Sequence, residues 1–169
     1  MIRLIGCILT AGGAAYLGFC AAERLRRQLR ELDELAAGLL LLGQELELSA
    51  PELAVLMERL KRRTHGTAKR LFSMYEQELS CLGSATAAQL WERAVSGLED
   101  LTDEAKECLL PLGEVLGRYE CHEQCEAVVT VRARILHLRE REERDCKLRC
   151  RAYQTVGLSG GAFLVILLL

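Results

Sequence analysis

The chain has 169 residues, of which 50% are hydrophobic but only 5% aromatic, and it contains two prolines. Leu, Ala, Glu and Arg dominate, and these residues lose least on entering a helix. No stretch alternates apolar and polar residues as a half-buried strand does, so we predict one all-α unit. The net charge of −2 comes from 22 basic and 24 acidic residues in the same segments, which argues against nucleic acid as a partner.

Each end of the chain carries a long segment without charged residues. Residues 4–22 form an uncharged run of 19, and residues 152–169 form one of 18. As helices these runs would reach roughly 27–29 Å, close to the hydrocarbon thickness of a bilayer. We therefore predict an N-terminal transmembrane helix over 1–22, a helical bundle domain over 23–151 and a C-terminal transmembrane helix over 152–169.

Other interpretations of the two ends stay open. The N-terminal segment could be a cleaved signal peptide, a lipoprotein signal ending at Cys20, or a buried core helix. The C-terminal segment could be a buried or interfacial helix. Two similar segments at opposite ends of one chain favour membrane insertion of both, with membrane lipid as a partner.

Basic residues lie next to both predicted spans, on the side of the middle domain. They are Arg24, Arg26, Arg27 and Arg30 after the first span, and Arg144, Lys147, Arg149 and Arg151 before the second. Basic residues near span ends stay on the cytoplasmic side, so we predict a cytoplasmic domain with both termini across the membrane. The inverted hairpin, with the domain outside, is the alternative.

The first helix of the middle domain is predicted over 23–48 by leucines spaced three and four apart. These leucines are at positions 25, 29, 32, 35, 39, 42 and 46. Ser49 and Glu52 have the spacing of a capping box, with Pro51 in the first turn of a second helix that ends near Arg63.

Three further helices are predicted by their start and stop signals. Residues 67–82 form one that follows His65–Gly66 and stops at Gly83. Thr86 and Gln89 have the spacing of a capping box that opens a short helix running past Trp91 to about Leu98. The next helix begins at 102–104, with acids in its first turn, and Pro111 predicts a kink or break within it.

The last helix is predicted from about Glu123 into the C-terminal segment, giving a bundle of about six helices. Residues 139–145, Arg-Glu-Arg-Glu-Glu-Arg-Asp, have no apolar side. Opposite charges four residues apart, such as Arg139 and Glu143, can support a solvated helix there.

The eight cysteines raise the question of a metal site. Cys121–Cys125 and Cys146–Cys150 are pairs one helical turn apart, and two such pairs could in principle bind zinc. If 121–150 is one helix, however, the pairs lie on the order of 35 Å apart and cannot share an ion. We therefore predict no metal ligand and expect reduced thiols that serve as small apolar residues. A metal or redox role is kept as the alternative.

The sequence offers no pattern of catalytic residues. His65, His122 and His137 have no nucleophile or carboxylate at a spacing that suggests a catalytic pair, and no phosphate-binding loop occurs. We therefore predict no catalytic residue and no cofactor, and expect a protein that is not an enzyme.

One stretch of the chain carries a more specific pattern. It is Leu112-Gly113-Glu114-Val115-Leu116-Gly117, followed by Arg118-Tyr119-Glu120 and then Gln124. With Gly6, Gly18-Phe19, Arg27–Leu32, Ala50–Leu53, Trp91 and Gly157-x-x-Gly160 in order, the chain resembles the stage III sporulation protein AB family of endospore-forming bacteria. Departures are Glu120 where the family usually has Asp, Leu48-Ser49-Ala50 in place of an aromatic-Gly turn, and the cysteines.

The resemblance implies a function. Members of this family are similar to the cytoplasmic domains of type II secretion and type IV pilus platform proteins. They are expected in the mother-cell membrane facing the forespore, with a cytoplasmic secretion-type ATPase and other stage III sporulation membrane proteins as partners. A homo-oligomer, and a membrane-tethered adaptor that dimerises through its leucine-rich first helix and is unrelated to secretion, stay open.

The candidate partner-contact residues follow from the same stretch. They are Leu112, Gly113, Leu116, Gly117, Glu120 and Gln124. The competing interpretation is that Gly113 and Gly117 only allow two helices to approach closely.

Overall fold

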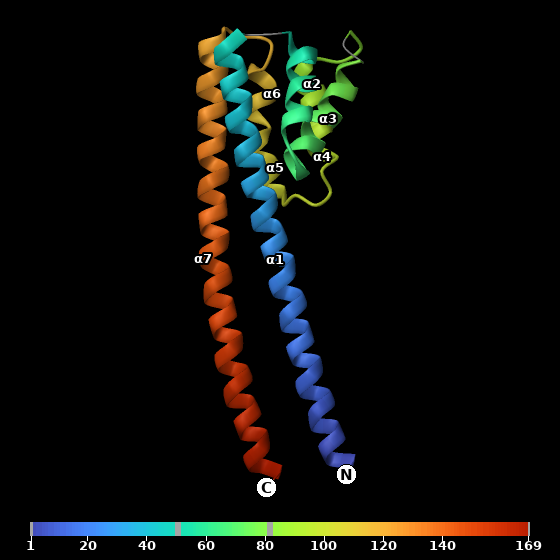
Figure 1. Cartoon of the computed structure of the whole chain (residues 1–169), viewed down its shortest axis with the longest axis vertical. Helices are drawn as coiled ribbons and strands as arrows, with labels where there is room; N and C mark the ends of the chain where they lie inside the picture. Colours follow the sequence, from blue (N-terminus) through green and yellow to red (C-terminus); the bar gives the residue numbers. More distant parts are fainter. Residues whose placement is uncertain (1, 50–51, 81–82, 169) are drawn as a thin grey trace. The chain divides into compact units, whose positions relative to one another are not determined.

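The computed structural model describes the backbone of residues 2–49, 52–80 and 83–168, and the side chains of 23–24, 26–48, 52–80 and 83–148. Every regular element in these ranges is a helix (Figure 1). The helices are α1 (Ile2–Ser49), α2 (Leu53–Arg63), α3 (Gly66–Leu79), α4 (Ala87–Ser96), α5 (Asp103–Leu109), α6 (Pro111–Val115) and α7 (Cys121–Leu168). The predicted all-α bundle is therefore confirmed.

The chain divides into two compact units. One comprises residues 28–140 and contains the helical bundle; the other comprises 1–27 and 141–169, the outer parts of α1 and α7. Among the described side chains, we find no helix that is long and apolar enough to cross a membrane. The side chains of the predicted spans, 1–22 and 152–169, lie outside those that the structure describes. The backbone of residues 2–22 and 152–168 is helical.

The core of the bundle is built on the predicted leucine stripe of α1. Leu32, Leu35, Leu39, Leu42 and Leu46 are all buried. They pack with apolar side chains from every other helix of the bundle, including Leu56, Leu60, Leu71, Phe72, Tyr75, Leu90, Trp91, Leu109, Leu112, Val128 and Ile135. Removing this apolar surface from water is the main force that holds the bundle together.

Within the bundle, α1 and α7 lie side by side over several turns (Figure 1). Arg132 Nε donates a hydrogen bond to the Ala36 carbonyl of α1 at 3.2 Å. Toward residue 49 of α1, the Cys121 thiol donates to the Leu46 carbonyl at 2.9 Å. Because residue 36 contacts residue 132 and residue 46 contacts residue 121, α1 and α7 run antiparallel.

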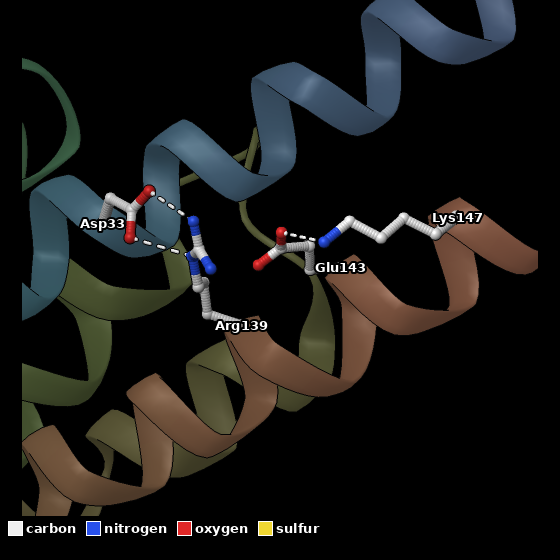
Figure 2. Close-up of polar contacts among 4 residues, drawn as sticks. All are labelled: Asp33, Arg139, Glu143 and Lys147. Carbon is white, nitrogen blue, oxygen red and sulfur yellow. Dashed lines mark hydrogen bonds and ion pairs between the residues drawn. The ribbon is translucent and has the colours of Figure 1, made fainter.

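Charged side chains add a second link between α1 and α7 (Figure 2). Arg139 Nε donates to Asp33 Oδ1 at 3.0 Å, and Arg139 Nη2 reaches Asp33 Oδ2 at 3.5 Å. Lys147 Nζ donates to Glu143 Oε1 at 2.7 Å, one turn along α7. The sequence suggested an ion pair of Arg139 with Glu143 on the same helix, whereas the structure pairs Arg139 with Asp33 on α1.

Two glutamates of α1 hold the neighbouring helices. Glu45 is 7% exposed and forms ion pairs with Arg63 and with Arg59 of α2, the latter at 3.5 Å. Glu34 Oε2 accepts a hydrogen bond from the Thr67 backbone N–H at 2.8 Å, at the start of α3. A carboxylate at this position satisfies an N-terminal amide and favours the positive end of the helix dipole.

The helix boundaries confirm some local signals and correct another. Thr86 and Gln89 form the predicted capping box of α4, and Pro111 divides the predicted fifth helix into α5 and α6. The capping box of Ser49 and Glu52 was wrong. Ser49 is the last residue of α1, and Glu52 is the N-cap of α2 without a side-chain cap bond. Burial of Leu46 one turn before Ser49 favours continuation of α1 to this point.

Candidate functional site

The candidate residues lie at one corner of the bundle, which we call the α6–α7 corner and define as residues 111–124. Pro111 occupies the first turn of α6, where its missing N–H costs nothing. Helix α6 ends when Leu116 turns to an extended conformation, and Gly117 follows with φ of +73°. A left-handed residue at this place favours glycine, and it lets the chain reverse toward α7.

Helix α6 is fixed against α4 by Trp91, which is fully buried. The Trp91 indole Nε1 donates a hydrogen bond to the Leu109 carbonyl at 2.9 Å, so the polar atom of this large side chain is satisfied. The backbone of Gly113 lies directly on the indole. A Cβ at position 113 would come within 2.7 Å of Trp91 Cδ1 and 2.9 Å of Trp91 Cβ.

Replacing Gly113 by alanine is therefore expected to destabilise the bundle. The methyl group would force α6 away from α4, and overpacking of this kind costs about 1–3 kcal/mol, offset in part by the better helix propensity of alanine. We expect a net loss of about 1–2 kcal/mol in the free energy of unfolding. Urea denaturation of full-length protein followed by circular dichroism measures it; a more stable variant would contradict the packing.

Tyr75 packs its ring edge-on against Trp91, with ring centroids 4.9 Å apart at 89°. Its phenol O–H donates to the Ala87 carbonyl at 3.4 Å. Burial raises the pKa of Tyr75 from 10.0 to about 12, because the phenolate would lose its hydration. Tyr75 is therefore buried in its neutral, protonated form.

This raised pKa predicts a loss of stability at high pH. The folded state holds the Tyr75 proton more tightly than the unfolded chain, so its contribution is full below about pH 10 and is lost as the pH rises toward about 12. We expect the urea midpoint to fall across this window, and to fall less steeply in Tyr75→Phe. An equal slope in both proteins would show that other groups cause the decline.

Gln124 ties the turn to the first turn of α7. Its Oε1 accepts a hydrogen bond from the Gly117 N–H at 3.3 Å, and its Nε2 donates to the Tyr119 carbonyl at 2.7 Å. A glutamine can do both because its amide carries an acceptor and a donor on one rigid group. The spacing of glycine and glutamine in the sequence therefore corresponds to a hydrogen-bonded turn.

The six candidate contact residues are close together but play different parts. Leu112, Gly113 and Leu116 are buried in the bundle, and Gln124 is half-buried with both amide atoms engaged. Gly117 and Glu120 are exposed. The buried residues specify the shape of the corner.

Two thiols lie at the start of α7, with Cys121 Sγ and Cys125 Sγ 4.0 Å apart. The pKa of Cys125 is raised to about 11, first by burial and then by its hydrogen bond and proximity to Cys121, with a smaller effect of Glu47. This thiol is therefore protonated at neutral pH and a poor nucleophile. Among the described side chains, no three His, Cys, Asp or Glu residues are grouped to hold a metal ion; Cys150 lies outside them.

A groove of about 850 Å³ runs between α4 and the α6–α7 corner. Its lining combines small and apolar residues with polar ones: Thr86, Ala87, Ala88, Gln89, Glu92, Leu110, Pro111, Gly113, Glu114, Leu116, Gly117 and Arg118. Half of the candidate contact residues, Gly113, Leu116 and Gly117, contribute to it. The α4 wall was not among the sequence candidates, because Thr86 and Gln89 indicated only a capping box there.

The model of the family described as stage III sporulation protein AB matches residues 3–169. The chain belongs to this family. Stage III sporulation protein AB of Bacillus subtilis (strain 168) is 23% identical over 176 residues, covering 100% of both chains. A solved structure of a stage III sporulation protein AB has a TM-score of 0.62 at 21% identity, covering 72% of this chain and 97% of its own. The resemblance predicted from the sequence is confirmed, and membership of the family associates the chain with sporulation.

Proposed function

We propose that this protein is a membrane-anchored structural component of a secretion-like channel complex between mother cell and forespore. In this proposal its bundle is cytoplasmic and serves as the platform on which a cytoplasmic secretion-type ATPase docks. The match of the family model from residue 3 to residue 169 carries the proposal, because it includes both uncharged terminal segments as well as the bundle.

The form of α1 and α7 supports the proposed anchoring. Each is an unbroken helix of 48 residues that begins or ends in an uncharged terminal segment and contributes to the bundle. Arg24, Arg26 and Arg27 follow the first uncharged segment within the same helix, as is usual at the cytoplasmic end of a span. Two such anchors would tether the bundle to the membrane.

The proposal is tested by fractionation and by binding. Full-length protein is expected in the membrane fraction, released by detergent and not by high salt, and it should then retain the purified ATPase on an affinity column. Deletion of its gene is expected to stop spore development after engulfment. Recovery of the full-length protein in the aqueous fraction would overturn the anchoring, and failure to retain the ATPase would overturn the platform role.

The adaptor alternative, dimerisation through the leucine stripe of α1, finds no support in the structure. Leu35, Leu39 and Leu42 are each at most 1% exposed within a single chain. These leucines cannot face a second copy without opening the bundle. Cross-linking through a photoreactive residue at exposed Leu40 of α1 would reveal a dimer that uses another face of this helix.

A further inference from the structure

We infer that the groove between α4 and α6 receives a basic amphipathic helix of the partner that docks on the bundle. The inference rests on the proposed platform function and adds the surface and the chemistry of recognition. It draws on the groove's apolar lining, the charge of its walls and the packing that keeps it open.

The apolar part of the groove is exposed and can contact side chains of a partner. Leu110 is 38% exposed, and Pro111 beside it is exposed as well. Ala87 and Ala88 on the opposite wall have short side chains that leave room between the helices. A helix that places apolar residues at every third or fourth position inserts them into a groove of this kind.

The walls of the groove are acidic. Glu92 on α4 and Glu114 on α6 both line it and are exposed. Among the described residues that line the groove, Arg118 is the one cation against these two acids, so a partner with Lys or Arg beside its apolar stripe is electrostatically complementary.

The ion pair between Arg118 and Glu114 does not prevent a cationic partner from binding in the groove. Arg118 Nη1 lies 3.8 Å from Glu114 Oε2, and the two side chains are 70% and 68% exposed. Exposed pairs of this kind contribute little and are screened by salt. Within the described structure Glu92 has no ion pair, so its charge is open to a partner.

A small anion is not the expected occupant, even though α4 begins at the groove. The Gln89 N–H already donates to Thr86 Oγ1 at 3.3 Å, and the Thr86 N–H donates to Gln89 Oε1 at 3.1 Å. This capping box uses amides that would otherwise attract an anion, and the carboxylates of Glu92 and Glu114 would repel one.

The groove is preformed. Trp91 binds the Leu109 carbonyl on one side and supports Gly113 on the other, so α4 and the α5–α6 segment are fixed relative to each other. A partner helix therefore meets walls that need little rearrangement, which keeps the entropic cost of docking low.

The experiment measures binding of purified ATPase to the full-length protein in detergent, by fluorescence titration. The variant is Glu92→Lys with Glu114→Lys; the control with the same change in charge is Glu58→Lys with Glu140→Lys. Glu58 pairs with Arg62 of α2 four residues away, as Glu114 does with Arg118, and it is exposed on another part of the bundle. We expect at least a tenfold weakening for the groove variant and less than a twofold change for the control.

A photoreactive residue at position 110 then identifies the segment in the groove. We expect it to cross-link to a helix of the ATPase that carries Lys or Arg, and substitution of those residues by Glu should restore binding to the groove variant. If the wild type binds and the groove variant binds equally well, the groove inference fails while the platform function stands. Cross-linking to a second copy, or to an ATPase segment without basic residues, would also overturn the inference. If the wild type does not bind the ATPase, both fail.

Discussion

Replacing Trp91 by alanine is expected to lower the free energy of unfolding by about 3–5 kcal/mol, which is the usual cost of removing a buried tryptophan. The side chain has no exposed surface and touches three parts of the bundle. It donates to the Leu109 carbonyl at 2.9 Å, meets the Tyr75 ring edge-on, and carries the backbone of Gly113. Its loss leaves a cavity beside α6 together with a buried carbonyl oxygen that has lost a donor.

Urea denaturation of the full-length protein, followed by circular dichroism, measures this effect. Trp91→Phe is the control, because it keeps an aromatic ring but cannot donate to Leu109; we expect a smaller loss of about 1–3 kcal/mol. Trp91 is the only tryptophan of the chain, so fluorescence cannot replace circular dichroism in these variants. A loss below about 1 kcal/mol for Trp91→Ala would contradict the assigned packing.

Comparing this substitution with the groove variant separates effects on stability from effects on binding. If Trp91 holds α4 and α6 at the right distance, the alanine variant should bind the partner more weakly at temperatures where it is still folded. The groove variant, Glu92→Lys with Glu114→Lys, should bind weakly as well but keep normal stability, because both carboxylates are exposed.

Local sequence signals predicted those features that depend on neighbours along the chain. The leucine stripe of α1, the capping box of Thr86 and Gln89 and the break at Pro111 all follow from spacings of three or four residues or from the missing N–H of proline. These effects act within one helix and need no knowledge of the fold. The Ser49–Glu52 box had the same spacing and was wrong, since the spacing alone does not show where the preceding helix ends.

Features that join distant segments could not be predicted in this way. The Asp33–Arg139 pair spans 106 residues, and the bond from Thr67 to Glu34 spans 33. In both cases a helix surface charge has several neighbours along its own helix, and only the packing of another helix decides between them. The sequence therefore suggested Glu143 for Arg139 and gave Glu34 no particular part.

The candidate site also combines features that local spacing predicts with features that only the packing of distant segments decides. The Leu-Gly-x-x-Leu-Gly pattern identified the α6–α7 corner correctly as a special structure, yet its leucines and Gly113 face inward to Trp91 and the core. The groove beside it also has walls from Glu92 and Leu110, which lie outside the pattern. Residues that build a surface are easier to find from a motif than residues that a partner touches, because packing imposes stricter spacing.

Replacing Gly66 by alanine is expected to cost about 2–3 kcal/mol, the second largest effect among these variants. Gly66 has φ of +54°, and a Cβ there would lie 1.9 Å from Glu34 Oε2. The substitution thus combines about 1–2 kcal/mol of left-handed strain with displacement of the carboxylate that caps α3. His65, the N-cap residue, makes no side-chain cap bond of its own, so nothing local replaces Glu34.

A double-mutant cycle distinguishes the two causes. Glu34→Ala alone should cost about 1–2 kcal/mol, since it removes the bond to the Thr67 N–H. If the alanine at 66 acts partly by displacing Glu34, the double variant should cost less than the sum of the single ones, by about 1 kcal/mol. Strict additivity would mean that backbone strain accounts for the whole effect of Gly66→Ala. In that case the Glu34 carboxylate and the Gly66 turn would stabilise the start of α3 independently, although they touch.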